Sequence, residues 1–153
     1  MTLDQPVDDF TLPATGGQSF QLHAMRGAPL VLYFYPKDDT PGCTDEGLQF
    51  KSLIEDFKAH RCSIFGISRD SLKAHDKFKA KMDFPFELLS DTDEAVCTQF
   101  DVMKMKNMYG KQVRGVERST FVIDAQGVLR KEWRGVKVPG HAQAVLEFVA
   151  TLG

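Results

Sequence analysis

The sequence predicts an α/β fold organised around one strand, one loop and one helix. Leu30 to Phe34 is a continuous apolar run, typical of a strand that is buried on both faces. After it, apolar residues recur at i, i+3, i+4 and i+7, a helix with one apolar stripe: Phe50, Leu53, Ile54 and Phe57. A second apolar run, Cys62 to Ile67, follows. These segments predict a β-α-β unit with parallel strands and a right-handed crossover.

The residues on either side of this unit predict a hairpin and an insertion. Phe10 to Leu12 and Ser19 to Leu22 are two short strands around Gly16-Gly17. Ser71 to Met82 predicts a helix and Phe86 to Ser90 a strand. Asp91 to Glu94 then start another helix, because acidic residues favour helix N-termini. We therefore expect an N-terminal hairpin and a helix-strand-helix insertion.

The last third of the chain predicts a β-β-α ending. Thr120 to Asp124 and Val128 to Trp133 are strands joined by a short turn that contains glycine. His141 to Leu152 has one apolar stripe and predicts the last helix. Between insertion and ending, Asp101 to Glu117 interleaves methionines with lysines. We interpret this segment as a loop that covers or borders a functional site, or else as a solvated lysine-rich connection.

Composition bounds the class of protein. The 153 residues are 42% hydrophobic and 26% charged, which predicts one compact domain over 1–153. A net charge of −2 argues against nucleic-acid binding. No apolar run reaches the 18 or so residues of a membrane span, and the acidic N-terminus does not resemble a signal peptide. We expect a cytoplasmic protein with neither nucleic-acid nor membrane partners.

The cysteines and histidines are few and scattered. The three cysteines, Cys43, Cys62 and Cys97, form no Cys-x-x-Cys pair and do not suggest a disulfide framework. The four histidines have no short spacing to them, so we expect no metal site and no cofactor.

Cys43 stands out by its place in the chain. Thr40 is a suitable N-cap and Pro41 a suitable first helical residue, which puts Cys43 in the first turn of the helix. The backbone N–H groups there lack partners within the helix and favour a thiolate. The alternative is a small buried cysteine without reactivity.

The energetics show what such a thiolate needs. A free cysteine has a pKa of about 8.5, and lowering it by roughly two units requires about 2.7 kcal/mol. A helix N-terminus supplies about 0.3–1 kcal/mol, and one charge-assisted hydrogen bond about 1.5–3 kcal/mol. A nearby cation or hydroxyl donor should therefore complete the site, and Thr40 is the local hydroxyl.

The loop resembles a known active-site signature. Pro36-Lys37-Asp38-Asp39-Thr40-Pro41-Gly42-Cys43 is similar to that of the peroxiredoxins, and its wording to the Q-type subgroup, or bacterioferritin comigratory proteins. Further matches, from about Val7 to the C-terminus, are Gly66 to Asp70, Met108 to Lys111 and Arg118 to Asp124. The resemblance implies the thioredoxin fold, with which the predicted element order agrees once the insertion is set aside.

The resemblance also implies a function. Cys43 would be the peroxidatic cysteine of a thiol-dependent peroxidase acting on hydrogen peroxide and organic hydroperoxides. Thr40 would hydrogen-bond the thiolate or peroxide, and Pro36 would shield the sulfur from water. Arg118 would supply positive charge; only its place in the motif distinguishes it from the other arginines.

The resolving step is where this chain departs from the subgroup. Its members carry a resolving cysteine five residues after the peroxidatic one or in the following helix, where this chain has Leu48 and Lys79. We expect a one-cysteine cycle in a monomer, with thioredoxin, glutaredoxin or a low-molecular-weight thiol as external reductant. Two alternatives stay open: Cys97 as an atypical resolving residue, and a thioredoxin-like binding or holdase module without peroxidase activity.

Overall fold

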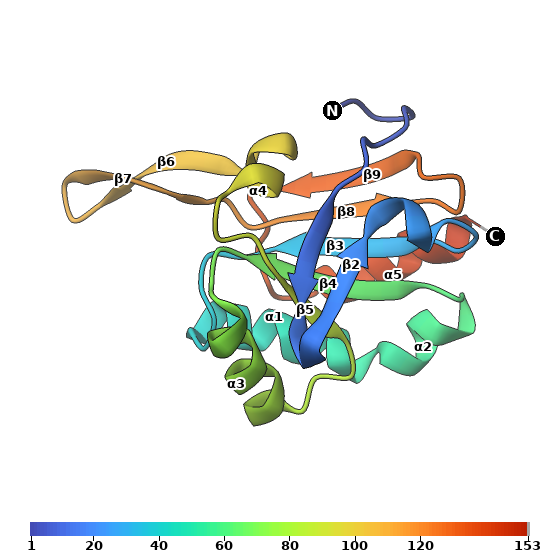
Figure 1. The fold of residues 1–153 in the computed structure, drawn as a ribbon, viewed down its shortest axis with the longest axis horizontal. Helices are drawn as coiled ribbons and strands as arrows, with labels where there is room; N and C mark the ends of the chain where they lie inside the picture. Colours follow the sequence, from blue (N-terminus) through green and yellow to red (C-terminus); the bar gives the residue numbers. More distant parts are fainter. Residues whose placement is uncertain (153) are drawn as a thin grey trace.

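A seven-stranded sheet forms the centre of residues 1–152, the part of the chain that the computed structural model describes (Figure 1). The end of the predicted domain, Gly153, lies outside these residues. The strands lie in the order β2 (Gln18–Gln21), β1 (Thr11–Ala14), β5 (Glu87–Ser90), β4 (Ser63–Ser68), β3 (Leu30–Phe34), β8 (Ser119–Ile123) and β9 (Leu129–Arg134).

The parallel pairing predicted for the β-α-β unit is confirmed. β3 is parallel to β4 and antiparallel to β8, and its five residues are all buried, which explains the continuous apolar run. In the β3–β8 ladder Phe34 lies opposite Ser119, so the residue before β8 lies beside the loop that follows β3. The N-terminal hairpin is confirmed by antiparallel β1 and β2, and β1 continues the sheet beyond β5.

Helices cover both faces of the sheet. One core cluster combines the sheet with α1 (Pro41–Ser52), α2 (Ile54–Ala59), α3 (Leu72–Met82) and α5 (His141–Thr151). The other core cluster combines the sheet with α4 (Ala95–Gln99) and the N-terminal hairpin. A short 3-10 helix, η1 (Thr15–Gly17), joins the two strands of this hairpin, and a second, η2 (Leu22–Met25), follows it. The predicted insertion is confirmed as α3, β5 and α4. No helix of residues 1–152 has the length and apolar character to cross a bilayer.

The single helix predicted after the loop is wrong, because the chain breaks it into α1 and α2. Leu53 leaves helical geometry at φ −105° and ψ 8°, and its N–H bonds to the Phe50 carbonyl in a tighter turn. The Ser52 hydroxyl donates to the Gln49 carbonyl, a backbone contact that competes with helical bonding. Phe50 and Phe57 nevertheless both reach the core.

The loop predicted for Asp101 to Glu117 is also wrong. β6 (Met103–Met108) and β7 (Lys111–Val116) form a separate two-stranded hairpin that extends away from the sheet (Figure 1). Methionine and lysine alternate over the first four residues of β6, which is strand periodicity. Tyr109 and Gly110 at the tip have φ of 54° and 80°, as a tight two-residue hairpin turn requires.

Gly47 sets how closely α1 approaches the segment after α3. A Cβ atom there would lie 2.4 Å from Cζ of Phe84, whose ring is itself packed against Phe78 and Phe86. We therefore predict that Gly47→Ala lowers the free energy of unfolding by about 1 kcal/mol or more through overpacking, although alanine favours the helix. Chemical denaturation measures the change.

Gly115→Ala in β7 is the matched control, because its nearest neighbour would be a flexible lysine methylene at 3.7 Å. Equal effects of the two substitutions would contradict the packing argument.

Candidate active site

Cys43 lies in the first turn of α1, as the sequence predicts. Pro41 is the first helical residue, and Thr40 precedes it in extended geometry, at φ −102° and ψ 154°. The first helical bond runs from the Thr44 N–H to the Thr40 carbonyl, at 2.8 Å. The backbone N–H groups of the first turn thus remain available near the thiol. The Cys43 side chain is only 1% exposed.

Arg118 contacts this thiol directly. Its Nη2 donates to Cys43 Sγ at 3.3 Å, and its Nη1 donates to Glu46 Oε1 at 2.7 Å. The β3–β8 register brings Arg118 here across 75 residues of sequence. Gly42 makes room for it, because a Cβ there would lie 3.1 Å from Nη2. One guanidinium therefore serves both a sulfur and a carboxylate.

Glu46 was not singled out from the sequence. It lies three residues after Cys43, on the same face of α1, and it is 1% exposed. Burial raises the pKa of Glu46 to about 7, although the Arg118 guanidinium opposes the shift. Its second oxygen, Oε2, has no hydrogen-bond partner among the described residues. The i+3 spacing was the available signal, but only the fold reveals its burial.

Arg118 remains a cation in this setting. Burial by itself lowers the pKa of Arg118, but Glu46 and Cys43 together raise it above its ordinary value. The charged form is thus stabilised by the two groups that it contacts.

The two other predicted site residues lie in the loop before α1. The Thr40 hydroxyl donates its single proton to the Lys37 carbonyl, at 2.8 Å, and therefore does not donate to Cys43. Its oxygen accepts no hydrogen bond from the first turn of the helix. Its oxygen lone pairs can still accept a hydrogen bond. Pro36, near the start of this loop, is half-buried. The structure thus joins Cys43 to Arg118 and leaves Thr40 and Pro36 nearby in sequence without a hydrogen bond to the sulfur.

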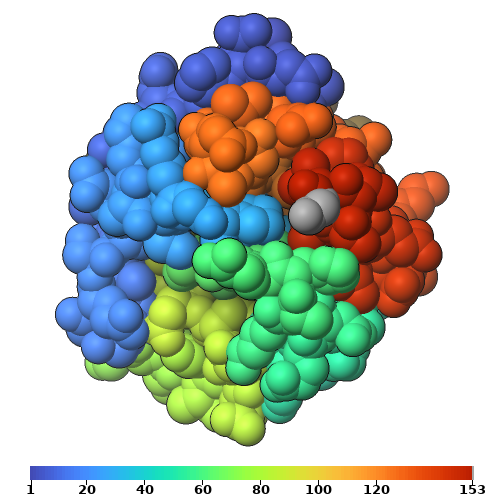
Figure 2. Space-filling view, turned by 90° about the vertical axis from the view of Figure 1, so that its right-hand side faces the viewer, coloured from blue at the N-terminus to red at the C-terminus, as the bar shows by residue number. Residues whose placement is uncertain are grey.

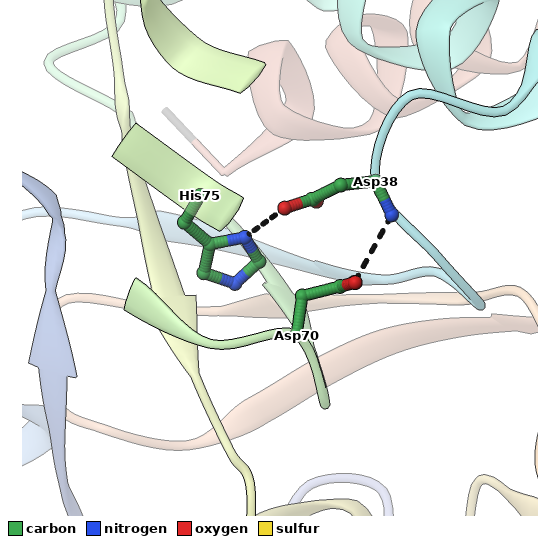
Figure 3. A group of neighbouring side chains, drawn as sticks. All are labelled: Asp38, Asp70 and His75. Atoms are coloured by element: carbon green, nitrogen blue, oxygen red, sulfur yellow. Dashed lines mark hydrogen bonds and ion pairs between the residues drawn. The ribbon is translucent and has the colours of Figure 1, made fainter. Parts of the chain in front are cut away.

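A buried polar network fastens the loop to the body of the protein (Figure 3). His75 Nδ1 lies 2.6 Å from Asp38 Oδ2, and Nε2 lies 2.9 Å from the Leu89 carbonyl. Because a carbonyl only accepts, Nε2 carries a proton. Tyr35 donates to the other Asp38 oxygen, and the Asp38 N–H donates to Asp70.

This network could also be viewed as a candidate metal site. Asp38, Asp70 and His75 each place one ligand atom within 4.8 Å of the others. Hydrogen bonds already satisfy these atoms, however, and both nitrogens of His75 are engaged. These hydrogen bonds explain the arrangement as an anchor of the loop before α1.

The other two cysteines are in unreactive surroundings. Burial raises the pKa of Cys62 to about 12. Burial, followed by the neighbouring Asp91, raises the pKa of Cys97 well above its usual range. Cys97 belongs to the α4 core cluster, whereas Cys43 belongs to the cluster on the other face of the sheet. A thiolate is disfavoured at both positions.

The larger hollows do not contain the thiol. One of about 510 Å³ lies between the loop residues Lys37 to Asp39 and α3. Another, of about 460 Å³, lies at the end of the molecule that faces the viewer in Figure 2, where the segment before β3 meets the ends of α2 and α5. That end is opposite to Cys43, which follows the carboxyl end of β3. The site is therefore defined by contacts and charge rather than by cavity volume.

Comparisons with known proteins agree on the family. Residues 3–132 match the AhpC/TSA family. Peroxiredoxin Bcp of Xanthomonas campestris is 55% identical over 146 residues, covering 94% of this chain and 91% of that protein. Peroxiredoxin Bcp of Bacillus subtilis is 44% identical, covering 96% and 95%.

Solved structures show the same similarity. The Xanthomonas campestris bacterioferritin comigratory protein, from work on its alkyl peroxide reduction activity, has a TM-score of 0.89 at 53% identity, covering 93% of this chain and 90% of that one. A mutant of PrxQ from Xylella fastidiosa has a TM-score of 0.94 at 42% identity, covering 99% and 96%.

The raised pKa of Glu46 predicts a pH-dependent stability. Between about pH 4.5 and about pH 7 the native state holds more protons at Glu46 than the unfolded chain does. The stabilisation from this residue is therefore complete below the unfolded pKa and is lost as pH rises through about 7. Glutamine does not titrate. We therefore compare the free energies of unfolding of the parent and of Glu46→Gln. As pH rises, the parent value minus the variant value should fall by about 1.4 kcal/mol for each pKa unit by which Glu46 is shifted.

Denaturation series between about pH 5 and about pH 8 measure this difference. The control is Glu55→Gln on α2, where the side chain is exposed. A difference between parent and Glu46→Gln that stays constant with pH would contradict the raised pKa.

Proposed function

This chain belongs to the AhpC/TSA family and is a thiol-dependent peroxidase of the Bcp and Q type, and we propose that Cys43 is the thiol that attacks the peroxide. The observation that carries the proposal is the 3.3 Å contact between Arg118 Nη2 and Cys43 Sγ in the first turn of a helix. A guanidinium and unpaired backbone N–H groups at one sulfur favour its thiolate.

The proposed reaction is a two-electron displacement. The Cys43 thiolate attacks one peroxide oxygen, the O–O bond breaks, and the second oxygen leaves as hydroxide or alkoxide and takes a proton. The sulfur becomes a sulfenic acid. Arg118 stabilises the thiolate before attack and the negative charge that develops on the peroxide during it.

Three neighbours of this pair support it in the proposal. Glu46 holds the guanidinium in place through its 2.7 Å hydrogen bond. Thr40 binds the peroxide through its hydroxyl, which has to turn away from the Lys37 carbonyl if it is to donate. Pro36 limits access of water to the sulfur. Of these, Glu46 and Thr40 act on charge and orientation, and Pro36 on solvation.

We further propose that the cycle uses one cysteine. Leu48 and Lys79 occupy the two resolver positions, and neither carries a thiol. The sheet lies between Cys97 and Cys43, which speaks against the Cys97 alternative. Cys62 precedes the start of β4 beside the start of β3, about 13 Å along the strand from the end where Cys43 lies. A disulfide requires Cα atoms within about 7 Å.

The wider assignment follows from this cycle. The proposed substrates are hydrogen peroxide and organic hydroperoxides, in line with the alkyl peroxide reduction activity named for the Xanthomonas campestris relative. The proposed reductant is external: thioredoxin, glutaredoxin or a low-molecular-weight thiol. We place the enzyme in the cytoplasm as a monomer.

Arg118→Met should slow the oxidation of Cys43 by peroxide about tenfold or more, since one charge-assisted interaction of about 1.5–3 kcal/mol is lost. Stopped-flow mixing with hydrogen peroxide measures the rate, and thiolate absorbance against pH shows the loss of thiolate. Cys43→Ser should abolish turnover.

Three variants serve as controls for this result. Arg61→Met removes an exposed arginine at the opposite end of β3 and should leave the rate unchanged. Cys62→Ser and Cys97→Ser should retain most of the activity. Parent-like peroxide consumption by Cys43→Ser would overturn the assignment of the thiol.

The one-cysteine cycle predicts the product of a single turnover. One equivalent of peroxide without added thiol should leave a dimedone-trappable sulfenic acid at Cys43, seen by intact and peptide mass spectrometry. A quantitative Cys43–Cys97 disulfide within one chain would instead make Cys97 the resolving residue. A Cys43 disulfide between chains would require a dimer.

A further inference from the structure

The hairpin of residues 103–116, here called the arm, exposes an unusual amount of apolar surface. Four of the seven large apolar side chains that are exposed in residues 1–152 belong to it: Met105 at 60%, Met108 at 49%, Tyr109 at 101% and Val113 at 42%. A two-stranded hairpin is only marginally stable alone in water, and contiguous exposed apolar surface commonly marks an interaction site. The proposed chemistry at Cys43 does not account for it.

The arm is also uniformly basic. Its charged residues are all positive: Lys104, Lys106, Lys111 and Arg114. The whole chain, in contrast, has a net charge of −2. Two of these cations form ion pairs with residues outside the arm: Arg114 with Glu94, and Lys104 with Asp101. Lys111 is the cation nearest to the tip. An apolar surface interleaved with cations is complementary to an acidic partner.

The strand register divides the arm into two faces. Met103 lies opposite Val116, and both pack with the α4 core cluster. Because side chains alternate along a strand, every second residue from this pair onward turns to the other side. This second face, here called the lysine face, consists of Lys104, Lys106, Met108, Lys111 and Val113.

The lysine face is linked to the site of the thiol through Lys106. Arg118 follows the end of β7 by two residues, and the Lys106 Nζ donates to the Val116 carbonyl at 2.5 Å, close to that point. Burial, followed by the Arg118 charge, lowers the pKa of Lys106, while Cys43 opposes the shift. Lys106 is thus within electrostatic reach of both groups, and the arm borders the approach to Cys43.

The dimensions favour a protein partner. Six residues per strand at about 3.3 Å each give a ribbon about 20 Å long, well beyond the reach of a small thiol. We propose that the lysine face and the tip of the arm dock an acidic protein that presents a reducing dithiol to Cys43. This inference rests on the proposed one-cysteine cycle, which needs an external thiol.

In the docked complex the partner dithiol supplies the two electrons that reduce the sulfenic acid. A partner thiolate attacks the Cys43 sulfur, the S–O bond breaks, and the oxygen takes a proton and leaves as water. The second thiolate of the partner then attacks the partner sulfur of the mixed disulfide. The Cys43 thiolate is released, and the partner retains the two-electron oxidation as its own disulfide.

The test compares two reductants of the oxidised protein: an acidic bacterial thioredoxin and the small neutral dithiol dithiothreitol. The arm variant is Met108→Ser with Lys111→Glu, a cross-strand pair on the lysine face. Its reduction by thioredoxin should be about tenfold slower or more, with a weaker dependence on salt. Its oxidation by hydrogen peroxide and its reduction by dithiothreitol should match the parent, which also shows that the variant is folded.

The matched control is Leu3→Ser with Lys58→Glu, the same chemical changes at exposed positions outside the arm. Parent-like reduction of the arm variant by thioredoxin, or an equal loss in the control, would overturn the inference. So would arm-dependent binding to phosphatidylglycerol vesicles with an unchanged thioredoxin rate, which would assign the arm to an anionic lipid surface.

These outcomes separate the two proposals. If the arm variant turns over normally with dithiothreitol and thioredoxin still reduces it at the parent rate, only the docking surface is overturned. A parent protein whose Cys43 is not oxidised by peroxide overturns the proposed function and this inference with it.

Discussion

The site depends on one guanidinium that is shared by two buried acidic groups. Arg118 donates to both Cys43 and Glu46, each only 1% exposed. Two buried anions beside one cation would leave a net negative charge, which is costly away from water. The pKa of Glu46, raised to about 7 by burial, relieves this conflict, because the carboxyl can take a proton near neutral pH. Arg118 can then serve the sulfur.

The sheet supplies the precision that this sharing requires. The antiparallel register of β3 and β8 places Phe34 opposite Ser119, so that the loop after one strand meets the residue before the other. The loop is held at its other side by Asp38, which binds His75 of α3. Gly42 and Gly47 let Arg118 and Phe84 approach the helix closely. A small set of long-range contacts thus fixes the first turn of α1 between two rigid elements.

The predictable part of this structure is the part that short-range patterns encode. Apolar runs and helical spacing predicted β3, β4, α3 and α5, and Thr40-Pro41 predicted the helix start that puts Cys43 in the first turn. Arg118 could be chosen only through resemblance, because its role depends on strand register. Glu46 and the Asp38–His75 pair were missed, since burial of a polar side chain is a tertiary property.

The arm was missed for a different reason. Its period-two alternation was visible, but both of its strands are largely exposed, and the alternation therefore does not separate a core face from a solvent face. The break at Leu53 was likewise hidden, because Phe50 and Phe57 keep the spacing of one continuous helix. Apolar periodicity in a sequence predicts helices and strands that pack against the core. It predicts poorly an exposed hairpin such as the arm, or a helix that is interrupted by a break.

The two halves of the proposed cycle, oxidation of Cys43 by peroxide and its reduction by another protein, would make opposite demands on α1. Attack on peroxide favours a thiol held beside Arg118 and shielded from water, as Cys43 is. Reduction by another protein requires that its sulfur reach Sγ in line, which a side chain 1% exposed does not permit without movement of the first turn. That turn has no side-chain cap, and α1 ends at Ser52 after only 12 residues. The fold therefore combines a rigid strand register with a helix start that tertiary contacts hold and no side chain caps.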